Sequence, residues 1–192
     1  MLIKKLKKEI ITIPNLLSLF RLLLIPIYIC LYLRAKRPED YILAASILAV
    51  SCLTDLFDGM IARQLNQITT IGKILDPFAD KATQFSLIFC LSIKYTVLWR
   101  VIILFLIKES FMMIAGYVSF KKGKILKGAL LSGKVCTTVI FISLSILVLL
   151  PNLQTSIVNT IAIVNILFML LSFADYAIVY IQGDKNFQPI KR

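Results

Sequence analysis

Six long apolar segments, separated by short polar connections, make up most of this chain of 192 residues. They cover roughly residues 15–33, 41–62, 72–93, 97–120, 130–150 and 156–181. A helix needs about 20 predominantly apolar residues to cross the hydrocarbon core of a bilayer. The hydrophobic fraction of 59% also exceeds that of ordinary soluble domains. The sequence therefore predicts an all-α, polytopic membrane protein with six transmembrane helices.

No polar linker divides the chain, so we expect one membrane domain over residues 1–192. Its expected parts are an interfacial segment (1–13), a six-helix bundle (14–182) and a cytoplasmic tail (183–192). In the first segment, leucines and isoleucines alternate with Lys4, Lys5, Lys7 and Lys8. This spacing is typical of a short amphipathic helix on an anionic membrane surface, with a solvated basic tail as the alternative.

The chain has a net charge of +12, and its basic residues are distributed unevenly between the two predicted sides of the membrane. Six helices put both termini on one side, which collects Lys4, Lys5, Lys7, Lys8, Arg63, Lys73, Lys121, Lys122, Lys124, Lys127, Lys185, Lys191 and Arg192. The other side collects Arg34, Lys36, Arg37, Lys94 and Arg100. Because cytoplasmic loops are the basic ones, both termini are predicted to be cytoplasmic. Contacts with anionic lipids explain the charge better than nucleic-acid binding does.

Four acidic residues lie where the second apolar segment ends and the third begins: Asp55 and Asp58 in the second, Asp76 and Asp80 in the third. Their spacings of three and four residues put each pair on one helix face. Carboxylates inside a membrane protein normally face a cavity, pair with a partner or bind an ion. The chain has no histidine, so hard oxygen ligands favour Mg²⁺ or Mn²⁺ over zinc. The alternative is that they cap helices and pair with nearby basic residues, namely Arg63, Lys73 and Lys81.

Small residues accompany the acidic cluster. Gly59 and Ala62 follow Asp58, and Gly72 precedes Asp76 by four residues. Small side chains let a nucleotide or a second helix approach closely, although helix packing alone explains any one of them.

The pattern Asp55-x2-Asp58-Gly59-x2-Ala62-Arg63-x8-Gly72-x3-Asp76-x3-Asp80 resembles the signature of the CDP-alcohol phosphotransferases. The resemblance implies a six-helix membrane fold, usually homodimeric, with a di-metal site on the cytoplasmic side. Asp55, Asp58 and Asp76 would be metal ligands, and Asp80 both a ligand and the catalytic base. The expected CDP site comprises Asp55, Asp58, Gly59, Ala62, Arg63, Gly72 and Asp76. The family reaction releases CMP when an alcohol attacks the β-phosphorus of a CDP-linked lipid.

Further segments resemble the bacterial phosphatidylglycerophosphate synthases of this family: Ile13 to Arg21, Leu75 to Lys81 and Ser132 to Val135. This resemblance implies CDP-diacylglycerol as donor, glycerol 3-phosphate as acceptor and a bacterial inner membrane as location. That group usually carries Arg-Glu where this chain has Lys108-Glu109, and lysine cannot hold a phosphate bidentately. A cardiolipin synthase of the same fold, with phosphatidylglycerol as acceptor, is therefore the alternative; inositol phosphate and serine are weaker ones.

An acidic acceptor requires basic residues near the metal site, and the candidates are Arg21, Lys81, Lys108 and Lys134. Adjacent helical residues point about 100° apart and do not face each other, so the alternative to a substrate role for Lys108 is a structural pairing with another helix rather than with Glu109. Asp175 is one such partner, although its own role is unassigned. The basic segment 120–127 is expected to form an interfacial helix, with simple headgroup binding as the alternative.

Two other function classes also account for acidic residues within membrane helices. A transporter or cation channel predicts a polar path across the whole bilayer, and the outer halves of the second and third segments contain no matching acids. A catalytically silent scaffold does not need all four aspartates. The sequence therefore favours an enzyme.

Overall fold

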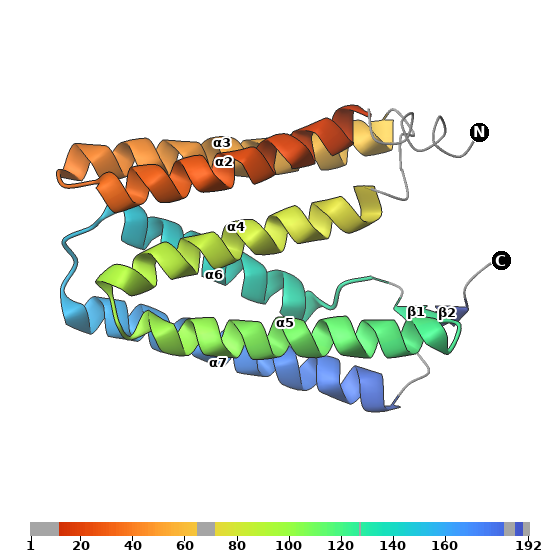
Figure 1. Cartoon of the computed structure of the whole chain (residues 1–192). Coiled ribbons are helices and arrows are strands. Elements are labelled where there is room, and N and C mark those ends of the chain that lie inside the picture. The colour runs from red at the N-terminus through yellow and green to blue at the C-terminus, as the bar shows by residue number, and fades with distance from the viewer. Residues whose placement is uncertain (1–11, 65–71, 127, 183–186, 190–192) are drawn as a thin grey trace. The chain divides into compact units, whose positions relative to one another are not determined.

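The computed structural model describes residues 12–64, 72–126, 128–182 and 187–189. These ranges contain six helices, which are α2 (Ile13–Arg34), α3 (Pro38–Gln64), α4 (Gly72–Lys94), α5 (Leu98–Lys121), α6 (Leu131–Leu149) and α7 (Thr155–Gln182) (Figure 1). Each predicted apolar segment matches one helix to within three residues at either end. The all-α prediction is confirmed. Most of the predicted amphipathic segment lies outside the described residues.

Four of these helices are long and apolar enough to cross a membrane: α2 from Asn15, then α5, α6 and α7. Helices α3 and α4 are long enough, but they carry the charged residues of the acidic cluster and its surroundings. The described helices thus confirm a membrane protein, while the number of six spans stays a prediction.

Local sequence explains where the first two helices begin. Thr12 is extended, and a proline follows in the first turn of α2, where its missing N–H breaks no helical hydrogen bond. Before α3, the Asp40 carboxylate accepts hydrogen bonds from the backbone N–H groups of Lys36 and Arg37. These bonds favour the ionised form and lower the pKa of Asp40.

The described residues form two compact units, one within 1–91 and 145–152 and the other within 92–144 and 153–192. In the first unit, α2 and α3 pack side by side (Figure 1). Tyr28, Tyr32 and Tyr41 form an aromatic series along this contact, with ring centroids 5.9 and 5.4 Å apart. The contact brings the N-terminal half of α2 alongside the C-terminal half of α3, which carries Asp55.

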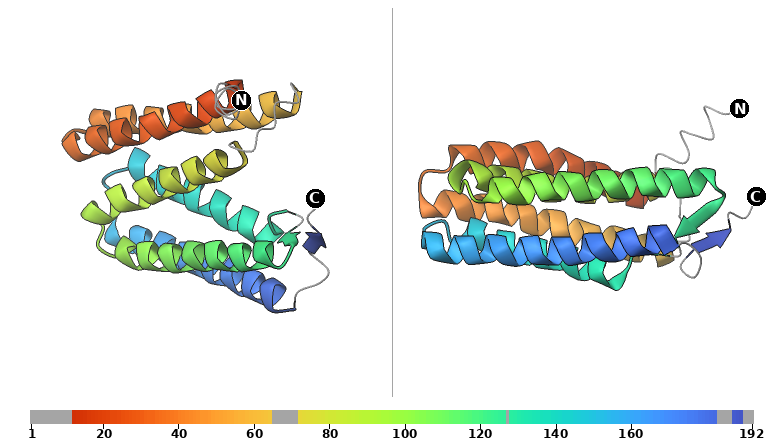
Figure 2. Two further views of the ribbon diagram at one scale, coloured as in Figure 1. Left: turned by 45° about the vertical axis from the view of Figure 1, so that its right-hand side comes forward. Right: turned by 90° about the horizontal axis from the view of Figure 1, so that it is seen from below.

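In the second unit, α5 and α7 run alongside each other (Figure 2). Phe111 of α5 packs edge-on against Phe173 and Tyr180 of α7. Helices α6 and α7 are joined by Asn165, which exchanges hydrogen bonds with Ser143 and is fully buried. Such interhelical hydrogen bonds fix helix register in an apolar environment.

The segment predicted as a basic interfacial helix has a different structure. Helix α5 ends at Lys121, and Gly123 follows with a φ of 73°, a left-handed conformation that glycine adopts without strain. Strand β1 (Lys124–Leu126) then pairs antiparallel with β2 (Phe187–Pro189). The helical prediction for 120–127 was therefore wrong over residues 122–126, and residue 127 lies outside the described residues. Part of the predicted tail is β2, whose Phe187 packs against Tyr180.

Candidate functional site

The acidic cluster lies on α3 and α4 of the first unit. Asp55 is exposed on α3, and Asp76 and Asp80 lie one turn apart on α4, each partly buried. Asp58 falls within α3, but its side chain lies outside the described residues, as do those of Ala62 and Arg63. Of the predicted nucleotide-binding positions, Gly72 begins α4 and is buried.

A stripe of polar side chains on α2 contacts the aspartates of both α3 and α4. Asn15, Ser18 and Arg21 follow one another at intervals of three residues, and all three are buried. Ser18 Oγ donates a hydrogen bond to Asp76 Oδ1 (2.5 Å). Arg21 Nη1 forms an ion pair with Asp55 Oδ1 (2.6 Å), in which the arginine is 2% exposed and the aspartate 47%. Helix α2 therefore contacts one carboxylate of α3 and one of α4.

Cys52 shows that a third carboxylate belongs to this region. Its thiol lies one turn before Asp55 on α3, and it interacts electrostatically with Arg21, Asp55 and Asp80. Asp55, Asp80 and the Arg21 guanidinium therefore all lie in the neighbourhood of the Cys52 thiol. Lys81, the next residue on α4, is partly buried.

The donor chemistry of this region fits a divalent cation. Asp55, Asp76 and Asp80 offer only carboxylate oxygens, which suit Mg²⁺ or Mn²⁺. Among the described side chains, no three His, Cys, Asp or Glu residues are close enough to share one ion. The side chain of Asp58, the fourth carboxylate of the pattern, lies outside this described set. The set is thus suitable in kind, and Asp58 is the expected further ligand.

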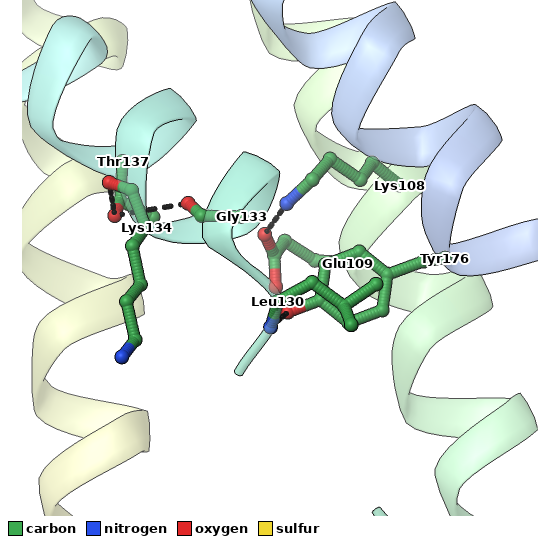
Figure 3. Close-up of polar contacts among 7 residues, drawn as sticks. All are labelled: Lys108, Glu109, Leu130, Gly133, Lys134, Thr137 and Tyr176. Carbon is green, nitrogen blue, oxygen red and sulfur yellow. Dashed lines mark hydrogen bonds and ion pairs between the residues drawn. The ribbon is translucent and has the colours of Figure 1, made fainter. Parts of the chain in front are cut away.

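Lys108 and Glu109 lie in the second unit and pair with each other. The Lys108 ammonium is 2.8 Å from Glu109 Oε1, and the lysine is buried (Figure 3). We expected neighbouring residues on a helix to diverge, and here the long flexible side chains bend until their charged ends meet. An interhelical partner for Lys108, such as Asp175, was the alternative to a substrate role, and it was wrong: in the described part of the chain the ion pair of Lys108 is with Glu109.

A cavity of about 670 Å³ lies between the start of α6 and the C-terminal half of α7. Lys134 and Asp175 bring opposite charges to its lining, and both are exposed. Ser132 also lines it, and the Ser132 Oγ atom is buried without a hydrogen-bond partner among the described residues. The first backbone N–H groups of a helix have no acceptors within the helix and favour anions. The cavity therefore offers an ammonium group, a helix N-terminus and a carboxylate.

Tyr176 fixes the geometry of this cavity. Its hydroxyl accepts a hydrogen bond from the Leu130 backbone N–H (3.1 Å), just before α6 begins (Figure 3). A Cβ atom added to Gly133 would lie 2.6 Å from that hydroxyl oxygen and 2.8 Å from Cε2 of the ring. Only glycine allows the tyrosine to approach α6 so closely. The first turn of α6, which carries Lys134, is thereby attached to α7.

Two parts of this arrangement were not assigned a role from the sequence. Ser18 belongs to the resembling segment from Ile13 to Arg21, and polar residues at positions 15, 18 and 21 of an apolar helix are themselves a signal of one buried polar face. Tyr176 gave no such signal, because a tyrosine beside Asp175 does not reveal which distant glycine it contacts.

Comparison with known proteins gives a family match over most of the chain. A family model described as CDP-alcohol phosphatidyltransferase matches residues 11–176. This range contains all four aspartates of the acidic cluster, the polar stripe of α2, and both Lys134 and Tyr176.

Individual relatives are similar over different lengths. The chain is 35% identical to a CDP-diacylglycerol--glycerol-3-phosphate 3-phosphatidyltransferase of Aquifex aeolicus over 173 residues, 86% of this chain and 94% of the relative. It is 45% identical to an Escherichia coli protein of the same name over 69 residues, 36% of this chain and 37% of the relative. A cardiolipin synthase (CMP-forming) of Streptomyces coelicolor is 37% identical over 97 residues, 50% of this chain and 42% of the relative.

Proposed function

This chain belongs to the CDP-alcohol phosphatidyltransferase family, and we propose that it transfers a phosphatidyl group from CDP-diacylglycerol to glycerol 3-phosphate. The Aquifex aeolicus relative, which the chain covers almost completely, supports this choice of donor and acceptor by its name. The structural observation that carries the proposal is the attachment of Asp55 and Asp76 to one face of α2. The products are phosphatidylglycerophosphate and CMP.

Asp55, Asp58, Asp76 and Asp80 are the proposed ligands of two Mg²⁺ or Mn²⁺ ions. When bound, these ions would neutralise the pyrophosphate of the donor and stabilise the charge that develops as its P–O bond breaks. The protein orients the proposed ligands, because Ser18 holds the Asp76 carboxylate and Arg21 holds the Asp55 carboxylate from the neighbouring helix α2. Partners of this kind keep ligand side chains in place before the metal arrives.

The donor is expected to bind with its acyl chains in the bilayer and its CDP group along α3 and the start of α4. Gly59, Ala62, Arg63 and Gly72 are the proposed lining, together with the aspartates. The acceptor hydroxyl attacks the β-phosphorus, forming a new O–P bond while the bond to CMP breaks. Asp80 is the proposed base and takes the proton of that hydroxyl.

For the acceptor phosphate, Lys134 is the most suitable of the four proposed basic residues. It lines the cavity at the N-terminus of α6, where ammonium and backbone N–H groups both favour an anion. Lys108 and Arg21, by contrast, are buried and already paired with carboxylates. Their proposed role is therefore to orient those carboxylates, and Lys81 remains a candidate for the acceptor beside Asp80.

A cardiolipin synthase with phosphatidylglycerol as acceptor is the second candidate. It is favoured by the Streptomyces coelicolor relative, which matches half of this chain, and by lysine at position 108. In either case we propose a homodimer in a bacterial inner membrane, with both termini and the aspartates on the cytoplasmic side.

A CMP-release assay tests the proposal. Purified protein in detergent is given CDP-diacylglycerol, Mg²⁺ and one acceptor at a time: glycerol 3-phosphate, phosphatidylglycerol, serine, inositol or inositol phosphate. Release with glycerol 3-phosphate alone supports the proposal, and release with phosphatidylglycerol alone supports the second candidate. If none of the acceptors releases CMP with Mg²⁺ or Mn²⁺, both are wrong.

A further inference from the structure

We propose that Asp175 determines acceptor specificity by accepting a hydrogen bond from a hydroxyl group that does not react. This inference rests on the proposed function, in which the cavity beside α6 receives glycerol 3-phosphate. That acceptor has two hydroxyl groups: the terminal one, which attacks phosphorus, and the one on the central carbon, which stays unchanged. The central hydroxyl is the group assigned to Asp175.

The position of Asp175 supports this assignment. It lines the cavity from α7, while Lys134 and Ser132 line it from the first turn of α6. Asp175 makes no hydrogen bond or ion pair with any other described residue, and its side chain is exposed. Within the described part of the chain, this carboxylate therefore keeps its hydrogen-bond acceptors for a ligand in the cavity.

The neighbouring tyrosine keeps Asp175 in that position. Successive residues on a helix point about 100° apart, so when Tyr176 packs against Gly133, Asp175 is turned to a different side of α7. The hydrogen bond from Leu130 to the Tyr176 hydroxyl fixes the start of α6 against α7. Lys134 lies on the first turn beyond this attachment, so the two charged residues of the cavity are held by the same contact.

The chemistry of the cavity fits a phosphate that carries hydroxyl groups. A phosphate alone is recognised by Lys134 and the N-terminus of α6, and a carboxylate would repel it. An ionised carboxylate, however, is a strong acceptor for a hydroxyl donor, and the resulting bond is stronger than one between neutral groups. One lysine and one aspartate in the same cavity therefore separate the two ends of a hydroxylated phosphate.

The test compares glycerol 3-phosphate with 3-hydroxypropyl phosphate, which keeps the phosphate and the reacting hydroxyl but lacks the central one. We expect the wild-type protein to prefer glycerol 3-phosphate by about tenfold or more in kcat/KM, because one charge-assisted hydrogen bond is lost with the analogue. In Asp175→Ala this preference should fall to near unity. The KM for CDP-diacylglycerol should stay unchanged, because that substrate does not contact Asp175.

Glu39→Ala is the matched control, since Glu39 is also an exposed acid, at the start of α3. It should keep the wild-type preference. Asp175→Ala that still prefers glycerol 3-phosphate by the wild-type factor overturns the inference, as does a wild-type protein that uses both acceptors equally. The second result needs no variant, so it holds even if Asp175→Ala does not fold.

The same experiment separates this inference from the proposed function. If the wild-type protein releases no CMP with glycerol 3-phosphate, the proposed function fails. If serine alone supports release, the acceptor has no second hydroxyl group for Asp175 to bind, and the hydroxyl assignment is overturned together with the choice of acceptor. If glycerol 3-phosphate is used but its central hydroxyl is not recognised, only the role of Asp175 is wrong.

Discussion

The acidic cluster of the first unit and the cavity of the second differ in whether their charged side chains have partners within the protein. In the first, Asp55 and Asp76 already have partners, since Arg21 and Ser18 reach them from a buried stripe on α2. In the second, Lys134 and Asp175 are exposed and lie in one cavity without an ion pair between them. Carboxylates that are already oriented suit the proposed ions and pyrophosphate, whose geometry must be held closely, whereas open charges suit the proposed acceptor, a small soluble molecule that enters and leaves.

Replacing Asp80, in the acidic cluster, should have the largest effect on activity. Asp80→Asn removes the proposed base and one metal ligand while it keeps the size of the side chain. General-base catalysis contributes about 10²- to 10⁴-fold, so we expect CMP release to fall by at least that factor. The fold and much of the nucleotide binding should persist, as measured by thermal unfolding and CDP-diacylglycerol binding. Unchanged turnover would exclude Asp80 as the base, and Glu39→Gln serves as the neutral control.

The polar stripe of α2 can be tested without touching a proposed ligand. Ser18→Ala removes the hydroxyl that contacts Asp76, leaving that carboxylate less well oriented. Loss of such a partner typically costs about 10- to 100-fold in metal affinity or activity, so the Mg²⁺ concentration for half-maximal CMP release should rise by about that factor. Ser18→Thr keeps the hydroxyl and should restore the wild-type value. An alanine variant with the wild-type Mg²⁺ response would show that Asp76 needs no partner on α2.

These two regions also differ in how far the sequence predicts them. The helices follow from apolar segments long enough to span a bilayer, and the aspartates stand out because acids are rare in such segments. Both signals are local. The pairing of Ser18 with Asp76 joins residues 58 positions apart, and hydrophobic pattern alone does not predict which helix supplies the partner. The attachment of Tyr176 to Leu130 is equally distant, at 46 positions.

Two predictions were wrong for physical reasons that can be named. One concerns the flexibility of the Lys108 and Glu109 side chains, and the other concerns a glycine that ends a helix. Helix geometry alone points Lys108 and Glu109 in different directions, whereas their flexible side chains allow the charged groups to meet at 2.8 Å. The predicted helix over 120–127 ignored Gly123, whose left-handed conformation ends α5 and redirects the chain into β1. A glycine just past a run of helical residues was the available signal.

The contact between Gly133 and Tyr176 allows the cavity to be changed while the acidic cluster is left intact. Gly133→Ala places a methyl group 2.6 Å from the Tyr176 hydroxyl oxygen, so α6 and α7 must move apart. Overpacking of this kind costs about 1–3 kcal/mol of stability. We expect the KM for the acceptor to rise, with the Mg²⁺ response of the aspartates unaltered. Gly116→Ala is the matched control, because its added Cβ would lie 3.6 Å from the Tyr180 hydroxyl, an ordinary contact.

Tyr176→Phe should have the smallest effect, and it separates the packing of the tyrosine from its hydrogen bond. The ring remains against Gly133, but the Leu130 N–H loses its acceptor, which costs about 0.5–1.5 kcal/mol. We expect a slightly lower unfolding temperature and an acceptor KM raised several-fold, with the KM for CDP-diacylglycerol unchanged. A uniform loss of activity towards both substrates would instead show that the hydroxyl supports the fold in general. A change confined to the acceptor would mean that the cavity, like the acidic cluster, depends on a neighbouring side chain for its geometry. In the acidic cluster Ser18 and Arg21 contact the carboxylates directly, whereas Tyr176 holds the backbone at the start of the helix that carries Lys134.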